Sequence, residues 1–183
     1  YGTVTGVQTC ALPICMILQY AKDNCNQLYV YDTDGKRLGE IALPTFGTTS
    51  VSGARGQKEL FYSFTSYTTP GAIYSYDVAT AKSTLLSTPK LSFRTQDYVT
   101  EMLFYTSKDG TRAPLFVTHK KGIKLNGKNP LLLYGYGGFN VTYKPYFLSS
   151  MIPFMERGGV YVHAVLRGGG EYGEQWQDRK SVV

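Results

Sequence analysis

Two apolar runs that each end in glycines constrain the fold of this chain more than any other feature. They are "NPLLLYGYGG" at residues 129–138 and "VYVHAVLRGGGEYG" at residues 160–173. A continuous apolar run is typical of a strand with both faces covered. Between the two runs, four apolar side chains have helical spacing: Leu148, Met151, Ile152 and Met155. The order strand, helix, strand predicts a βαβ unit with parallel pairing, and hence an α/β fold for this half.

The residues around this helix indicate where it begins and ends. Ser149 or Ser150 can cap its N-terminus, and Pro153 falls in the first turn, where the missing N–H is tolerated. Gly158 is expected to stop the helix.

The first half of the chain predicts short antiparallel strands separated by Gly, Pro and Asp turns. In "GQKELFYSFTSY" at 56–67, Leu60, Tyr62 and Phe64 fall on one side. Similar segments lie at 27–31, 38–44, 72–78 and 83–89. Four such strands at regular spacing suit one propeller blade, although a β-sandwich fragment fits the same periodicity.

A hairpin is expected where the two halves meet. Residues 99–119 contain two strand segments around Asp109-Gly110, the residue pair favoured in a type I′ turn.

Composition narrows the class of partner. The 183 residues carry a formal net charge of +6, but no basic run exceeds Lys120-Lys121, so no nucleic acid or membrane surface is expected as a partner. Cys10, Cys15 and Cys25 include no Cys-x-x-Cys pair, and the chain has two histidines. We therefore expect no metal site, and no cofactor.

The two ends differ from the body of the chain. Residues 1–14 begin without methionine, lack periodicity and look like translated adaptor sequence, as do residues 177–183. Both are expected to be non-native tails. No stretch reaches the length of a membrane span.

The glycines after residue 134 have a possible chemical role. Gly135, Gly137 and Gly138 let the backbone approach a ligand, and the Tyr136 hydroxyl can donate to developing negative charge. Loops at the carboxyl ends of strands build the sites of open α/β sheets. On spacing alone, a tight turn with packed tyrosines explains the sequence equally well.

From Cys15 to Trp176, the chain resembles the prolyl oligopeptidase family of serine peptidases. The resemblance is densest in residues 104–140 and in "LRGGGEYGEQW" at 166–176. It implies a mixed fold, the last part of a β-propeller at 15–90 followed by the incomplete N-terminal part of an α/β-hydrolase domain at 91–176. "FYSFTSYTTPGAIYSYD" resembles the last propeller blade.

The family resemblance also implies residue roles. Tyr136 matches the tyrosine whose hydroxyl donates to the oxyanion hole, and Phe139 matches the phenylalanine that lines the proline-binding pocket. The family's Ser, Asp and His triad matches nothing here, because no serine has glycines two residues to either side. His119 and His163 are expected to be structural, since neither has the partners of a triad base.

Three other polar residues are expected to have structural roles. Glu171 belongs to the glycine-rich turn, and Asp109 to the hairpin. Arg167 is expected to anchor the turn through hydrogen bonds to carbonyls or carboxylates.

The resemblance implies a serine endopeptidase that cleaves short peptides after proline through an acyl-enzyme. The chain itself is expected to be inactive, and the full-length enzyme to be a cytoplasmic monomer, or a periplasmic or secreted one. Related enzymes prefer basic residues or blocked termini, and Phe139 favours proline. The alternative is a non-catalytic β-rich module that binds a peptide or sugar.

Overall fold

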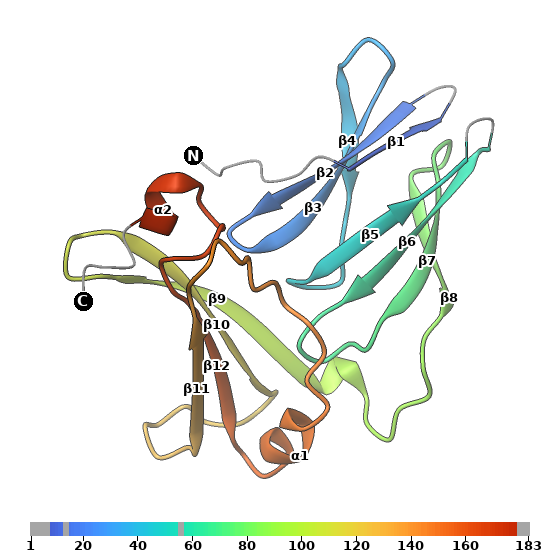
Figure 1. Ribbon diagram of the computed structural model, residues 1–183. Coiled ribbons are helices and arrows are strands. Elements are labelled where there is room, and N and C mark those ends of the chain that lie inside the picture. Colours follow the sequence, from blue (N-terminus) through green and yellow to red (C-terminus); the bar gives the residue numbers. More distant parts are fainter. Residues whose placement is uncertain (1–7, 13–14, 55–56, 179–183) are drawn as a thin grey trace. The chain divides into compact units, whose positions relative to one another are not determined.

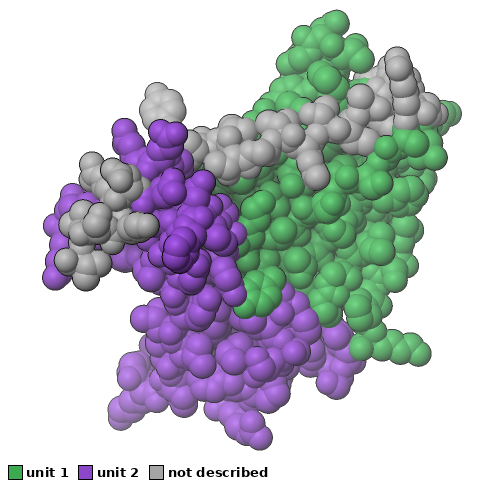
Figure 2. Space-filling view, viewed as in Figure 1, with its two compact units in different colours: residues 1–90, 144–146 green, residues 91–143, 147–183 purple. Residues whose placement is uncertain are grey.

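The protein divides into two compact units (Figure 2). Unit 1 comprises residues 1–90 and 144–146, and unit 2 comprises residues 91–143 and 147–183. The computed structural model describes residues 8–12, 15–54 and 57–178.

Unit 1 consists of two four-stranded antiparallel sheets, each in sequence order (Figure 1). The first sheet contains β1 (Gln8–Leu12), β2 (Cys15–Lys22), β3 (Cys25–Tyr31) and β4 (Arg37–Ile41). The second contains β5 (Thr48–Ser52), β6 (Glu59–Thr65), β7 (Ala72–Asp77) and β8 (Lys82–Ser87). Four antiparallel strands in a row are the architecture of a propeller blade.

The two sheets of unit 1 share one apolar core. Leu60, Tyr62 and Phe64 are at most 2% exposed, which confirms the alternation predicted for this strand. They belong to the same buried cluster as Ile17 and Leu28 of the first sheet. Each sheet thus buries one face, as period-two patterning requires.

Three strands were not predicted. The tail at residues 1–14 includes β1, and β2 follows it directly. β5 has the sequence TTSVS, in which polar β-branched and serine side chains replace apolar alternation, although Thr49 is buried. With these three strands added to the five predicted ones, unit 1 has two four-stranded sheets. Residues 1–7, 13–14 and 179–183 of the expected tails lie outside the described residues, and their non-native origin stays a prediction.

Unit 2 contains a mixed sheet in the order β11-β12-β10-β9. Its strands are β9 (Tyr98–Thr106), β10 (Arg112–Lys120), β11 (Leu131–Tyr136) and β12 (Val160–Val165). β9, β10 and β12 pair antiparallel, and β11 pairs parallel with β12. The helices are η1 (Thr95–Asp97), α1 (Met151–Glu156) and α2 (Glu174–Asp178).

The predicted strand, helix, strand unit is confirmed. In the sequence, α1 connects β11 to β12, which pair in parallel, and the helix buries Ile152 and Met155. Gly158 follows the helix with φ +82°, the left-handed conformation that ends helices. Ser150 occupies the N-cap position, but its side chain makes no capping hydrogen bond, so that part of the expectation was wrong.

The hairpin between β9 and β10 also differs in detail. Asp109 and Gly110 form the turn, but of the two only Gly110 has a positive φ, +83°, whereas a type I′ turn needs two. The Gly110 N–H bonds to the Ser107 carbonyl at 2.9 Å, and the Ser107 N–H bonds to that of Thr111 at 2.8 Å. Gly110 therefore occupies the left-handed position of this turn, a conformation that glycine adopts without steric cost.

The two parallel strands differ in how far their side chains are buried. All six residues of β12 are buried, as predicted. β11 is at the edge of the sheet, where Leu131 and Leu133 are 60% and 64% exposed. The expectation that both faces of this strand are covered is therefore wrong for the chain as described.

Candidate active site

The glycine-rich loop begins where β11 ends. The parallel register pairs Tyr136 with Val165, the last residues of β11 and β12. Residues 137–143 and 166–173 therefore both begin at the carboxyl ends of these neighbouring strands. Loops at this edge are the usual location of sites in open α/β sheets.

Steric contact explains one of the glycines directly. A Cβ on Gly137 would lie 2.3 Å from the Arg167 carbonyl oxygen and 2.5 Å from that of Leu166. No side chain fits at such distances from backbone. In contrast, a Cβ on Gly138 would meet only the Tyr136 hydroxyl, at 3.9 Å.

Three hydrogen bonds join the loop to the turn after β12. The Leu166 N–H donates to the Tyr136 carbonyl at 3.3 Å, and the Asn140 N–H donates to the Gly168 carbonyl at 3.1 Å. The third bond runs from the Tyr143 N–H to Oε1 of Glu171, at 3.2 Å. The connection between the two strands therefore continues past their ends.

An aromatic cluster fixes the rings around the loop. The Tyr143 ring lies 5.8 Å from that of Tyr136, 5.4 Å from that of Tyr134 and 5.6 Å from the His163 imidazole. A hydrogen bond to Tyr143, and burial, raise the pKa of Tyr134. Such ring pairs favour defined geometries. Tyr143 is the residue that sequence analysis missed, since its separation from the Tyr-Gly-Tyr motif gave no signal.

Phe139 presents its ring to solvent. Its side chain is 84% exposed, and its φ of +53° is followed by +58° at Asn140. A bulky residue with positive φ is an uncommon, strained feature that clusters at functional sites. The Phe139 ring is thus accessible from solvent at the loop.

Both histidines lie in strands, as predicted. His163 is 1% exposed, and burial lowers its pKa to about 4, so it is neutral near pH 7. His119 is 7% exposed, and its Nδ1 lies 2.9 Å from the Lys120 carbonyl oxygen. The buried, neutral His163 imidazole packs against the rings of Tyr134 and Tyr143, which is the environment of a structural residue.

Glu171 is a buried carboxylate in the glycine-rich turn. It is 5% exposed, and burial raises its pKa, against the opposing effect of backbone hydrogen bonds that include the Tyr143 N–H. A Cβ on Gly169 would lie 2.2 Å from Glu171 Oε2, so the turn is built closely around this carboxylate.

Arg167 anchors the start of the turn, as expected. Its guanidinium forms an ion pair with Asp109 and donates to Ser107 Oγ at 2.9 Å. The Thr111 N–H and the Arg167 guanidinium lower the pKa of Asp109 to about 2. Both residues therefore tie the turn to the β9–β10 hairpin.

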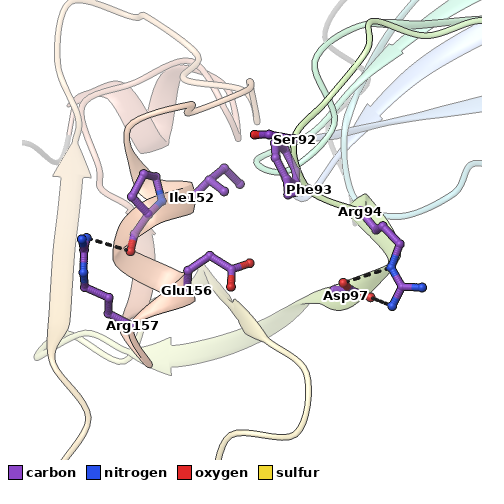
Figure 3. A pocket seen from close by; sticks show the side chains of 8 residues that line it. Ser92, Phe93, Arg94, Asp97, Ile152, Glu156 and Arg157 are labelled. Atoms are coloured by element: carbon purple, nitrogen blue, oxygen red, sulfur yellow. Dashed lines mark hydrogen bonds and ion pairs between the residues drawn. The ribbon is translucent and has the colours of Figure 1, made fainter.

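A cavity of about 590 Å³ lies between α1 and residues 92–97, and neither Tyr136 nor Phe139 lines it (Figure 3). Its two carboxylates are occupied: Asp97 pairs with Arg94 at 2.8 Å, and Glu156 pairs with Lys120 and Tyr98. The Lys120 and Tyr98 hydrogen bonds lower the pKa of Glu156. With both carboxyl groups already engaged by other side chains, this cavity is not suited to acid–base chemistry.

Within the described parts of the chain, no cluster of three His, Cys, Asp or Glu side chains is arranged to hold a metal ion. Cys15 and Cys25 are buried, and burial raises the pKa of the Cys25 thiol to about 12. No helix among the described residues has both the length and the apolar character of a membrane span.

Comparison with known proteins finds a family model that matches the first half of the chain and relatives that match most of its length. Residues 8–89 match the family model of the prolyl oligopeptidase N-terminal β-propeller domain. The prolyl endopeptidase of Elizabethkingia meningoseptica is 46% identical over 160 residues, which cover 87% of this chain and 23% of that protein. The chain thus spans about a quarter of the length of this relative.

Solved structures are similar over 97% of the chain. A structure from a study of two prolyl endopeptidases is 41% identical with a TM-score of 0.81, and 26% of it is covered. Prolyl oligopeptidase B from Galerina marginata, bound to a 25mer macrocyclization substrate, is 29% identical with a TM-score of 0.83, and 25% of it is covered. The propeller match over unit 1 and the similarity along nearly all of the sequence both relate the chain to the prolyl oligopeptidase family.

Proposed function

We propose that the chain is part of a serine peptidase that cleaves short peptides on the carboxyl side of proline through an acyl-enzyme. In this proposal, unit 1 contributes propeller blades, and unit 2 contributes the first strands of an α/β-hydrolase domain. The loop that begins at Tyr136 supplies one donor of the oxyanion hole.

The sheet of unit 2 supports the α/β-hydrolase assignment. β11 and β12 are parallel and joined through α1, and both continue into glycine-rich loops at one edge. The leucines of β11 are exposed on both faces, which suits a strand that further strands and helices of a larger sheet would cover. This assignment accounts for an apolar run that is otherwise costly to expose.

The placement of Tyr136 is the observation that carries the proposal. Tyr136 ends β11, its ring packs against Tyr143, and its hydroxyl lies near Gly138, where no side chain competes for space. A hydroxyl held in advance can donate to the oxyanion of a tetrahedral intermediate without reorganisation.

Phe139 supports a preference for proline. Its exposed ring offers an apolar face that suits a pyrrolidine. The bound peptide in the Galerina marginata enzyme is consistent with a peptide as the substrate class. The chain alone should be inactive, because its sequence holds no nucleophile elbow.

The test uses the full-length protein encoded by the reading frame that contains this chain. Hydrolysis of a blocked Gly-Pro-p-nitroanilide substrate is measured for wild type and Tyr136→Phe. Loss of the hydroxyl should lower kcat by about 10² to 10³ with little change in KM, because the donor acts in the transition state. An active wild type with an unaltered kcat in the variant removes Tyr136 from the mechanism.

Two comparisons address the remaining alternatives. Substrates that end in arginine, or that carry a blocked N-terminal residue, are assayed in parallel, and cleavage of these in preference to proline overturns the specificity. A full-length protein that binds proline peptides or sugars but hydrolyses none of the substrates would instead support a binding module.

A further inference from the structure

We infer that Glu171 is a positioning residue for the oxyanion donor: its buried carboxylate holds Tyr143, and Tyr143 in turn holds the Tyr136 ring. The inference rests on the proposed function of Tyr136. Glu171 itself touches no reacting atom.

The first link is the bond from the Tyr143 N–H to Glu171 Oε1, at 3.2 Å. Glu171 is 5% exposed, so this bond is protected from competing water. In such a low-dielectric environment a hydrogen bond is electrostatically stronger than in water. The backbone position of Tyr143 is therefore set by a side chain 28 residues away.

The second link joins the Tyr143 ring to the Tyr136 ring, whose centroids are 5.8 Å apart at an interplanar angle of 42°. The His163 imidazole and the Tyr134 ring also lie beside the Tyr143 ring, at 5.6 Å and 5.4 Å between centroids. Because these strand residues limit where the ring can go, a change at the Tyr143 backbone is expected to shift the Tyr136 ring.

The turn is shaped around this arrangement. Gly169 leaves room for the Glu171 carboxylate, since a Cβ there would lie 2.2 Å from Oε2. A Cβ on Gly170 would lie 2.9 Å from the Asn140 carbonyl oxygen. The glycines of the "RGGGEYG" segment therefore allow Glu171 and its turn to approach the Tyr136 loop closely.

The two left-handed residues explain why the loop needs such a hold. Phe139 and Asn140 have φ of +53° and +58°, and strained backbone persists only where its surroundings fix it. The Asn140 N–H donates to the Gly168 carbonyl, which attaches the chain at the second left-handed residue. Three residues further on, Glu171 accepts the Tyr143 N–H and attaches the chain a second time. Loss of Glu171 releases the second of these two attachments.

The experiment combines activity with hydrogen exchange in the full-length protein. Glu171→Ala should lower kcat roughly 10- to 100-fold, the effect of a displacement near 1 Å at a catalytic group. Glu171→Gln should recover most of this, since its amide oxygen can still accept the Tyr143 N–H. Glu174→Ala, the same change at an exposed carboxylate three residues away, should leave kcat unaltered.

A double-mutant cycle separates positioning from general structural support. In the Tyr136→Phe background, Glu171→Ala should cost less than about twofold in kcat, because its effect passes through the missing hydroxyl. An equal cost in both backgrounds, or none in the wild-type background, overturns the inference.

Exchange of the Tyr143 amide hydrogen provides a readout that does not depend on catalysis. It should accelerate in Glu171→Ala but not in Glu171→Gln, and an unchanged rate in Glu171→Ala overturns the first link. If Tyr136→Phe leaves kcat unaltered, the proposed function fails. The exchange result would still decide whether Glu171 holds the loop.

Discussion

Replacement of Gly137 by alanine tests whether the close approach of the two loops is a requirement of the fold. The added Cβ would lie 2.3 Å from the Arg167 carbonyl oxygen, whereas ordinary contact begins near 3.4 Å, so the backbone must move by about 1 Å. Neither neighbouring atom belongs to a flexible side chain. Overpacking of this kind typically destabilises a protein by about 1–3 kcal/mol.

Gly138 provides a matched control one residue away. Its Cβ would meet only the Tyr136 hydroxyl, at 3.9 Å, and its φ is not in the left-handed region. Gly138→Ala should therefore leave the free energy of unfolding within about 0.5 kcal/mol of wild type or raise it slightly, because alanine restricts the unfolded chain.

Urea unfolding of the 183-residue chain can be followed by fluorescence of its single tryptophan, Trp176. Trp176 is 5% exposed, and its carbonyl accepts the Gly168 N–H at 2.9 Å, so its emission reports on the turn that Gly137 contacts. Unfolding is measured below the concentration at which light scattering detects self-association of the chain. Equal midpoints for the two alanine variants would refute the steric argument.

Two further predictions concern pH and association. Burial lowers the pKa of His163 to about 4 from an ordinary value near 6.5, so the unfolded chain binds the proton first as pH falls; stability should decrease between about pH 6.5 and 4. His163→Leu should remove that component from urea midpoints measured across this range, and an identical pH profile contradicts it. The exposed β11 edge should make the chain self-associate, and Leu133→Lys should lower its sedimentation-detected oligomer fraction, whereas Leu133→Met should not.

Sequence patterns predicted those elements whose own side chains repeat. The alternation at Leu60, Tyr62 and Phe64 identified β6, and the helical spacing that includes Ile152 and Met155 identified α1. β5 escaped because Thr and Ser side chains carry little apolar signal, although strand pairing and the burial of Thr49 hold it in the sheet. Periodicity reports on apolar faces, so strands held mainly by backbone hydrogen bonds are invisible to it.

The exposure of β11 shows a different limit. An apolar run predicts that a strand needs neighbours to cover both of its faces, but it does not show that this stretch of chain contains those neighbours. Leu131 and Leu133 remain exposed at the sheet edge. The site shows a similar division. The Tyr-Gly-Tyr-Gly-Gly-Phe motif drew attention to Tyr136 and Phe139 through their type and spacing. Contacts made by Tyr143 and Glu171 depend on the parallel register of β11 and β12, which brings residues 28 apart together.

The conformation of the Tyr136 loop is a joint property of the two glycine-rich segments. Positive φ at Phe139 costs about 1–2 kcal/mol, whereas asparagine tolerates the left-handed region at Asn140. Within the loop, the Val141 N–H donates a turn bond to the Gly138 carbonyl. The other attachments come from residues 166–171, which can reach the loop only because Gly137, Gly169 and Gly170 carry no side chain. The parallel pairing of β11 with β12 places the two segments side by side, and the glycines then allow contact. The strain at Phe139 is therefore maintained by strand pairing, so the outward aromatic ring and the Tyr136 hydroxyl are both consequences of the fold of unit 2.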